Sequence, residues 1–395
     1  MELNNKQKQG LEIAIDRYIR GEKLTIISGY AGTGKSTLVK FIVNALPGVN
    51  PEEDVIYTSF TGKATQVLAK KGNKNTSTLH RLLFKSAPRP DGTFVRIPVP
   101  KINYKVVIVD EISMVPKELM SKLISYDIHI IGLGDPFQLP PVEKNEDNHL
   151  LDHPHIFLDE IMRQAAESEI IQLTMKIRNG EPIPYFKGKE VQVIPKEELS
   201  TGMLMWADQI LVATNNTRVA INNRMRDLLG RGDKPEDGDK VICCRNYWDK
   251  ISDQEMSLIN GTIGTIKNSY SSFSVIPGFL TTERTPRRIE TLSADFIGDS
   301  GEDYGSLIMD KQMILKGTKT LDWKTEYKVG KHIKYCSLIP LEFAYAYAIT
   351  CHKAQGSEWD KVLVIEENFP FDKEEHARWL YTACTRSSEK LVLVR

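Results

Sequence analysis

One segment near the start of the chain has the composition and spacing of a phosphate-binding loop. Residues 29–36 fit the pattern G-x-x-x-x-G-K-[ST], directly after an apolar run and before an amphipathic one. Glycines let successive backbone N–H groups turn toward phosphate oxygens, and a helix N-terminus adds favourable partial charge. Lys35 would reach the β- and γ-phosphates, and the Ser36 hydroxyl would ligate Mg²⁺. The pattern predicts a nucleoside triphosphate site formed by Gly29, Gly32, Thr33, Gly34, Lys35, Ser36 and Thr37.

Polar residues follow two later apolar runs. Asp110 comes directly after run 106–109 and could hold the Mg²⁺, while Glu111 could orient or deprotonate the attacking water. An acidic pair is by itself compatible with a solvated turn, but a phosphate loop in the same chain favours catalysis. Run 128–133 leads to Gln138, which could sense the γ-phosphate or equally lie in a surface loop.

Hydrolysis also requires positive charge against the developing charge on the γ-phosphate, commonly from an arginine of another domain. Arg163 and Arg386 are candidates, although their neighbours in the sequence do not separate them from arginines in surface salt bridges.

Short apolar runs and amphipathic stretches alternate over the first 160 residues. Runs 24–28, 55–58, 106–109 and 128–133 predict buried strands, and residues 36–45 predict a helix. Similar runs recur at 209–213, 361–365 and 391–394. This alternation is typical of parallel sheets covered by helices on both faces, and it predicts two α/β domains.

Two segments depart from this alternation. Residues 86–101 carry four prolines around Asp91-Gly92, a hairpin-turn signal, and predict a small protruding β-ribbon. Residues 236–335 contain short β-rich pieces at 240–242, 262–266 and 273–276 among many turn residues. The second segment predicts a small all-β insertion, for which a barrel is one candidate form.

Composition limits the class of protein. The 395 residues are 41% hydrophobic and 26% charged, as expected for two or three folded domains. Fifty-two basic residues balance fifty-two acidic ones, so a polyanion would have to bind a locally basic surface. The five cysteines form no C-x-x-C pair. The first residues lack the apolar core of a signal peptide. No apolar run approaches the ~20 residues needed to span a bilayer. A cytoplasmic protein is expected.

Together these segments resemble the motif series of superfamily 1 helicases, most closely the RecD-like and phage Dda-like 5′→3′ DNA helicases of branch 1B. The resemblance extends from about residue 3 to residue 394, with the motifs in the family's order. Residues 3–7 resemble the Q motif, 29–36 motif I, 58–64 motif Ia, 110–114 motif II, 132–141 motif III, 348–358 motif V and 380–386 motif VI. Phe60 departs from the proline usual in motif Ia, and 387–390 are less basic than in the family.

The resemblance implies roles that spacing alone does not assign. Gln7 would read adenine, Arg163 and Arg386 would act as arginine fingers, and Gly356 and Glu358 would line the nucleotide site. Single-stranded DNA would be contacted by Thr61, Lys63, Thr78, His80, Phe94, Thr350, His352 and Lys353. For His80 and His352, a buried and hydrogen-bonded histidine is the alternative interpretation.

The resemblance also implies an architecture. We expect an α/β fold with two RecA-like P-loop NTPase domains, the first at 1–155 with a β-hairpin pin at 86–101. The second would comprise 156–235 and 336–395, interrupted by an SH3-like β insertion at 236–335. ATP would bind between the domains, and DNA would lie across both. Because the chain begins at the Q motif, the compact Dda-like arrangement is expected, without an additional N-terminal domain.

The expected function is that of an ATP- and Mg²⁺-dependent 5′→3′ DNA helicase, acting as a monomer on single-stranded DNA and on junctions with duplex. Single-strand-binding or replication proteins are candidate partners, and no membrane is involved. One alternative is a translocase that strips proteins or remodels forks without processive unwinding. Another is an ATP-gated nucleic-acid-binding module, against which Glu111 and the two arginines argue. RNA stays open as a substrate, because stacking and phosphate contacts discriminate sugars poorly.

Overall fold

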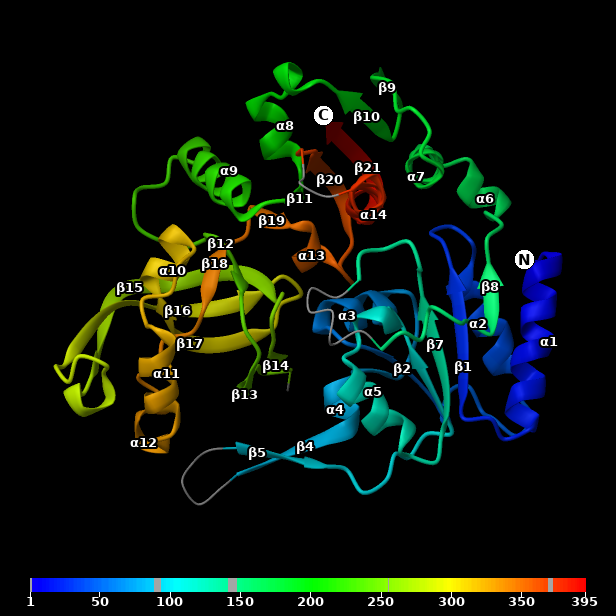
Figure 1. Ribbon diagram of the computed structural model, residues 1–395, viewed down its shortest axis with the longest axis horizontal. Coiled ribbons are helices and arrows are strands. Elements are labelled where there is room, and N and C mark those ends of the chain that lie inside the picture. The colour runs from blue at the N-terminus through cyan, green and yellow to red at the C-terminus, as the bar shows by residue number, and fades with distance from the viewer. Residues whose placement is uncertain (1, 89–93, 141–147, 255, 369–371) are drawn as a thin grey trace. The chain divides into compact units, whose positions relative to one another are not determined.

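The chain forms two compact units in the computed structural model, which describes residues 2–88, 94–140, 148–254, 256–368 and 372–395 (Figure 1). Unit 1 comprises Met1–Lys85, Ile97–Leu211 and Ala354–Arg395, and unit 2 comprises Ser86–Arg96 and Val212–Lys353. No helix in the described part of the chain combines the length and apolarity needed to cross a bilayer.

Unit 1 contains a six-stranded sheet in the order β3-β2-β6-β7-β1-β8, and all its recorded pairings are parallel. Its strands are β1 (Leu24–Gly29), β2 (Val55–Ser59), β3 (Thr76–Thr78), β6 (Val106–Val109), β7 (His129–Gly134) and β8 (Ile156–Leu158). Its helices are α1 (Asn5–Ile19), α2 (Lys35–Ala45), α3 (Gly62–Lys70), α4 (Leu79–Leu83) and α5 (Lys117–Ile124).

Helices cover both faces of this sheet because its strands are apolar throughout. Ile27 packs in one core with residues of α1 and α2, whereas the adjacent Ile26 packs in a second core with residues of α4 and α5. Successive side chains of a strand point to opposite faces, so each continuous apolar run serves both cores. The carboxyl ends of β1, β6 and β7 therefore lead into loops at one edge of the sheet.

A second sheet of unit 1 contains the strands β11-β20-β21-β10-β9 in that order. Parallel pairings join β11 (Gln209–Val212), β20 (Trp359–Ile365), β21 (Ser387–Val394) and β10 (Val191–Ile194), and β9 (Phe186–Lys187) pairs antiparallel at the edge. Its helices are α6 (Arg163–Ala166), α7 (Glu169–Asn179), α8 (Thr201–Trp206) and α14 (Lys373–Cys384). The Asp372 side chain caps α14 by accepting a hydrogen bond from the Glu375 N–H.

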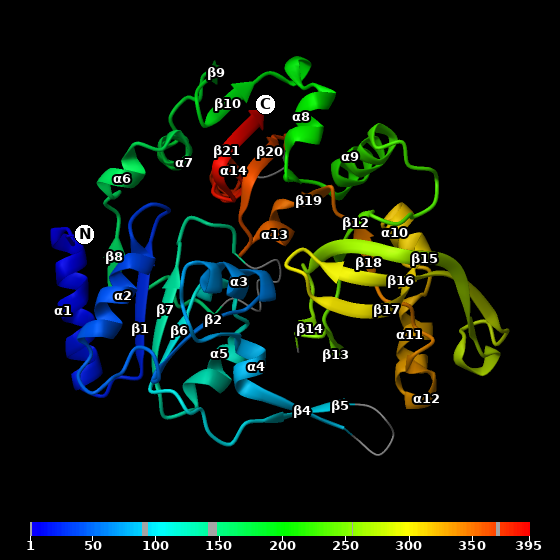
Figure 2. The same ribbon diagram turned by 180° about the vertical axis from the view of Figure 1, so that it is seen from behind.

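Unit 2 is built on a five-stranded antiparallel sheet in the order β17-β16-β15-β12-β18 (Figure 2). Its strands are β12 (Lys240–Cys243), β15 (Ile263–Ile276), β16 (Arg287–Gly298), β17 (Asp303–Asp310) and β18 (Phe343–Tyr345). Further elements are α9 (Asn215–Leu228), β13 (Tyr247–Ile251), β14 (Ser257–Leu258), α10 (Lys311–Lys316), α11 (Trp323–Gly330), α12 (Ile333–Cys336), β19 (Ala348–Thr350) and α13 (Cys351–Ala354).

The predicted α/β class and every predicted strand of the two parallel sheets are confirmed. The ribbon predicted at 86–101 corresponds to β4 (Phe84–Pro88) and β5 (Phe94–Pro98), which pair with each other, while its turn Asp91-Gly92 lies outside the described residues. The segment 236–335 contains the predicted strands, but two of the predicted pieces belong to the single strand β15, and the helices α10 to α12 follow the strands.

Candidate functional site

The phosphate loop connects β1 to the first turn of α2. Gly32 and Gly34 have φ of 77° and 80°, values that favour glycine, and a Cβ on Gly34 would lie 2.5 Å from Gln7 Nε2. The Lys35 ammonium donates hydrogen bonds to the carbonyl oxygens of Gly29 at 2.6 Å and Tyr30 at 3.0 Å. Ser36 and Thr37 follow in the first helical turn. The loop thus combines backbone N–H groups, a helix N-terminus and an ammonium, as phosphate binding requires.

The predicted acidic pair follows β6. Asp110 Oδ1 accepts a hydrogen bond from the Glu111 N–H at 3.0 Å, and Glu111 has a φ of 50°, which is uncommon for a residue with a side chain. Burial raises the pKa of Asp110 to about 6, the Glu111 charge adds to this increase, and Lys35 opposes it. A carboxylate whose charge is penalised in this way fits a site for a divalent cation, to which the Ser36 hydroxyl would be a second ligand.

The structure brings Arg386 to Glu111. The Arg386 guanidinium is buried, and its Nη1 lies 3.8 Å from Glu111 Oε1. It also donates to the Thr382 carbonyl at 3.1 Å, the Ser357 carbonyl at 3.3 Å and the Thr385 hydroxyl at 3.2 Å. These contacts fix the guanidinium beside the carboxylate predicted to act on the attacking water.

Sequence reasoning missed Tyr381, which joins the phosphate loop to the loop after β7. The buried Tyr381 hydroxyl accepts a hydrogen bond from the Ala31 N–H at 2.8 Å and donates one to Asp135 Oδ2 at 2.6 Å. Burial raises the pKa values of both Tyr381 and Asp135, so the phenol stays protonated and remains the donor. The only signal in the sequence was its position inside residues 380–386.

Further contacts hold the loop that follows β7 against elements around the second sheet of unit 1. The Leu139 N–H donates to the Thr382 hydroxyl at 2.9 Å, and its carbonyl accepts from Gln355 Nε2 at 2.6 Å. Arg378 donates to the Pro136 carbonyl at 3.0 Å. Gln138 lies within this loop and is half-buried. The residues that follow β7 are therefore held by α14 and by the segment after α13, so displacement of either would move them.

Gln7 is buried at the N-terminus of α1. Its Oε1 accepts from the Asn4 N–H at 3.1 Å, and its Nε2 donates to the Thr33 carbonyl at 3.2 Å. The Asn4 side chain in turn accepts from the Gln7 N–H at 2.8 Å, which completes a capping box. Gln7 Nε2 also donates to Met162 Sδ at 3.2 Å, so a base would have to use the second position of Oε1 or displace one of the Nε2 bonds. In this arrangement Gln7 ties α1 to the phosphate loop.

Four of the predicted DNA contacts lie in unit 1. Thr61 and Thr78 cap α3 and α4 through their hydroxyls. Lys63 Nζ lies 4.0 Å from the centre of the Trp359 ring, and the His80 ring lies near Phe60 and Phe84 with centroid distances of 5.6 and 6.4 Å. Phe60, at the position where the family has proline, thus packs against His80.

Motif V residues fall into both units. In unit 1, Gly356 has a φ of 70°, a Cβ there would lie 3.2 Å from Thr61 Oγ1, and Glu358 forms an ion pair with Lys71 at 3.7 Å. In unit 2, Thr350 is buried at the end of β19. Burial lowers the pKa of His352. Lys353 Nζ donates a hydrogen bond to Cys244 Sγ at 3.1 Å. The side chains of Arg163 and Phe94 lie outside the described part of the chain.

Comparisons with known proteins agree with these observations. Residues 2–193 match the model of an AAA domain family, and residues 345–394 match that of the UvrD-like helicase C-terminal domain. The ATP-dependent RecD2 DNA helicase of Deinococcus radiodurans is 25% identical over 98% of this chain and 49% of its own length. The ATP-dependent DNA helicase Dda of Enterobacteria phage T4 is 31% identical over 45% of this chain and 43% of its own.

The chain therefore spans less than half the length of each of these two relatives. A solved structure of two coordinating Pif1 helicases at forked duplex DNA matches all of this chain and 92% of its own, with a TM-score of 0.50 and 17% identity. That likeness shows the fold, in which the two parallel sheets are those of two RecA-like domains. With its motifs in order from residue 3 to residue 394, the chain is similar to the superfamily 1B helicases, the branch of RecD-like and Dda-like proteins.

Proposed function

We propose that this chain is an ATP-driven motor that translocates on single-stranded DNA and unwinds duplex in the 5′→3′ direction. The observation that carries the proposal is the pair of connections from the first sheet's nucleotide loops to motif VI. Ala31 and Asp135 share the Tyr381 hydroxyl, and Glu111 faces Arg386. A change at the γ-phosphate would therefore act directly on α14 and on the second sheet behind it.

The proposed chemistry uses the residues around Lys35. Lys35 would leave the carbonyls of its own loop and pair with the β- and γ-phosphates, and Glu111 would accept the proton of the attacking water. Arg163 and Arg386 would act as arginine fingers that stabilise the charge developing on the γ-phosphate, and Gln138 would sense the γ-phosphate. Ser36 and Asp110 would hold Mg²⁺, which supplies charge neutralisation to the phosphates when bound.

The proposed DNA path uses Thr61, Lys63, Thr78 and His80 of unit 1 and Thr350, His352 and Lys353 of unit 2. A lysine over Trp359 and a histidine between two phenylalanines offer the mixture of charge and aromatic surface that single strands bind. Gly356 lies against Thr61, so movement of motif V would reach motif Ia directly.

We also infer the organisation of the whole motor. Residues 1–155 would form the first motor domain, 156–235 with 336–395 the second, and 236–335 an SH3-like insertion. The paired strands β4 and β5 would form the strand-separating pin. We infer the 5′→3′ direction from the resemblance to branch 1B. We expect a monomer in a reducing, cytoplasmic location, which suits the five free cysteines.

The test of this proposal is ATP turnover with and without single-stranded DNA. We expect strong stimulation in the wild type, and no turnover in Lys35→Ala, which lacks the phosphate-clamping charge. Glu111→Gln should retain binding of ATP and DNA while losing turnover, because an amide is not a general base. Near-normal turnover in Glu111→Gln would refute the assignment of Glu111. Turnover that is stimulated by DNA without duplex unwinding would favour a translocase instead.

A further inference from the structure

Unit 2 carries an exposed surface of aromatic and basic side chains that no motif accounts for. Trp323 and Tyr327 of α11 are 71% and 60% exposed, and Phe279 of the neighbouring turn is 63% exposed. The exposed lysines of the same region are Lys324, Lys328, Lys331 and Lys334. We call these seven residues the aromatic–lysine surface. Exposed rings of this size are costly to leave in water, so their grouping calls for a ligand.

The outward direction of these side chains is fixed by the opposite face of α11. Thr325 and Val329 are buried, and Val329 packs in a core with Leu280, Ile289 and Leu321. Asp322 caps the helix by accepting from the Thr325 N–H at 3.0 Å and the Thr325 hydroxyl at 2.7 Å. Because residues four apart lie on one side of a helix, anchoring Thr325 and Val329 turns Trp323 and Tyr327 together to solvent.

The aromatic rings and the ammonium groups are interleaved. Lys331 Nζ lies 4.3 Å from the centre of the Tyr327 ring, and Lys324 Nζ lies 5.8 Å from that of Trp323. Phe279 makes an edge contact with Tyr335 at a centroid distance of 5.7 Å, and Lys334 lies 5.7 Å from the Tyr335 ring. Trp323, Tyr327 and Tyr335 thus each have an ammonium group close to the ring, which places charge and stacking area within reach of one nucleotide.

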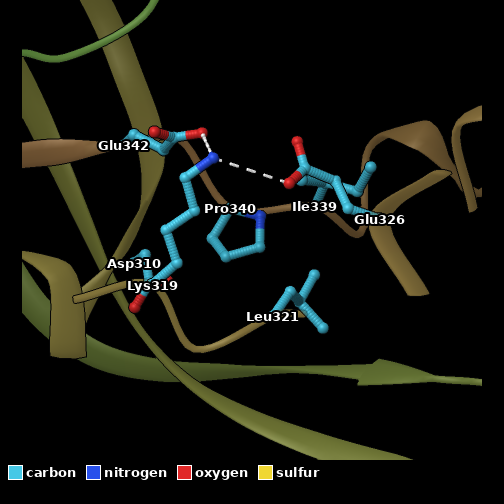
Figure 3. A pocket seen from close by; sticks show the side chains of 7 residues that line it. All are labelled: Asp310, Lys319, Leu321, Glu326, Ile339, Pro340 and Glu342. Atoms are coloured by element: carbon cyan, nitrogen blue, oxygen red, sulfur yellow. Dashed lines mark ion pairs between the residues drawn. The ribbon is translucent and has the colours of Figure 1, made fainter. Parts of the chain in front are cut away.

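The carboxylate of this helix is withdrawn from the surface. Between residues 323 and 334 the chain has four lysines and one acidic residue, Glu326. Figure 3 shows Glu326 turned toward Lys319, which also pairs with Glu342. The Lys319 Nζ distances are 3.6 Å to Glu326 Oε2 and 2.6 Å to Glu342 Oε1, and Arg245 also pairs with both carboxylates. The four lysines therefore keep their charge uncompensated by the acidic residue of their own segment.

We propose that the aromatic–lysine surface is an accessory binding site for single-stranded nucleic acid, with bases on Trp323 and Tyr327 and phosphates on the lysines. Lysines are depleted at protein–protein interfaces, whereas charge interleaved with aromatic rings is typical of single-strand binding. The proposal rests on the proposed function for its ligand, but it concerns a surface of unit 2 outside every helicase motif. It would hold a strand outside the motor groove and lengthen the stretch of DNA that one chain covers.

The test compares binding of labelled oligothymidylates of about 8 and about 30 nucleotides, since single-strand sites cover ~4–16 nucleotides. The double variant Trp323→Ala, Tyr327→Ala should bind the long oligonucleotide at least about thirtyfold more weakly, the worth of two stacked bases at ~1 kcal/mol each, and the short one like the wild type. The double variant Lys324→Gln, Lys331→Gln should lower the slope of log affinity against log salt by about 1.4. Matched controls are Tyr185→Ala, which removes a ring that is 59% exposed on unit 1, and Lys196→Gln.

A second readout is specific to stacking. Bases stacked on Trp323 should quench tryptophan fluorescence when the long oligonucleotide is added, and Trp323→Phe should lose that component. Unchanged binding of the long oligonucleotide by both double variants, with unchanged quenching in Trp323→Phe, would overturn the accessory site and leave an acidic protein as the better partner. If DNA-stimulated ATP turnover persists in those variants, the proposed function stands without the accessory site. If the wild type shows no DNA stimulation at all, the proposed function itself fails.

Discussion

Replacing Tyr381 with phenylalanine tests the link between the phosphate loop and motif VI. The change removes one hydroxyl and keeps the buried ring, so packing is retained while two hydrogen bonds are lost. A bond to a buried carboxylate contributes about 2 kcal/mol and a neutral one about 1 kcal/mol, so we expect the free energy of unfolding to fall by about 3 kcal/mol. The Ala31 N–H also loses the hydrogen-bond partner that orients the phosphate loop. If the less ordered loop costs about 1 kcal/mol of ATP-binding free energy, ATP should bind roughly fivefold more weakly.

The effect should depend on pH with a definite sign. Burial raises the pKa of Asp135, and the hydrogen bond from Tyr381 opposes that increase, so Tyr381→Phe should raise this pKa further. A carboxyl group whose folded-state pKa lies above its unfolded value costs stability while it is ionised, and the cost disappears as pH falls through the folded-state pKa. The difference in stability between wild type and variant should therefore shrink on acidification.

The assay is urea unfolding at about pH 7.5 and about pH 5, together with ATP binding measured at the higher pH. The matched control is Tyr126→Phe, which removes a hydroxyl that donates to the neutral Val99 carbonyl at 2.6 Å. The control should lose only about 1 kcal/mol, without pH dependence and without a change in ATP binding. If Tyr381→Phe behaves like this control in all three measurements, the inferred bridge does not operate.

Three further changes test other parts of the site. Arg386→Lys keeps a positive charge but loses the guanidinium hydrogen bonds to Thr382, Ser357 and Thr385. Steady-state kinetics should therefore show kcat lowered by roughly 10³-fold, with folding intact. A change in KM alone would contradict the role of Arg386 as an arginine finger. Phe94→Ala should reduce duplex unwinding more than DNA-stimulated ATP turnover, if the ribbon offers an apolar wedge to the terminal base pair; an equal fall in both rates would exclude the pin. Gly356→Ala should lower the free energy of unfolding by about 1–2 kcal/mol, because Gly356 has a φ of 70° and the new Cβ would lie close to Thr61. An unchanged free energy of unfolding in urea would show that the turn at Gly356 relaxes to accept the side chain.

The sheets and the phosphate loop could be predicted because their signals are local. Runs such as 106–109 are apolar at every position, since both faces of the strand are buried, and few other structures need that pattern. The loop needs glycines at fixed offsets for its backbone conformation, and positive φ at Gly32 and Gly34 agrees with that need. Asp110 and Glu111 follow from their place at the end of a buried strand.

The remaining features depend on partners that are distant in the chain. Tyr381 carries no local sign of its bond to Ala31, which lies 350 residues earlier. Strand β15 includes the polar residues 267–272, which remain in the strand because most of them pair with β16 rather than because of their own preference. Helices α10 to α12 are short, and α11 is held by the core residues Val329 and Leu321 rather than by helix propensity.

The most direct test of the central claim is unwinding of two duplexes that differ only in the end that carries the single-stranded tail. Both are measured with ATP and Mg²⁺ at one fixed ionic strength, because salt weakens loading through the phosphate contacts. We predict unwinding of the 5′-tailed duplex, little unwinding of the 3′-tailed duplex, and none of either by Glu111→Gln. A clear preference for the 3′-tailed duplex, or unwinding that survives in Glu111→Gln, would contradict the proposed motor.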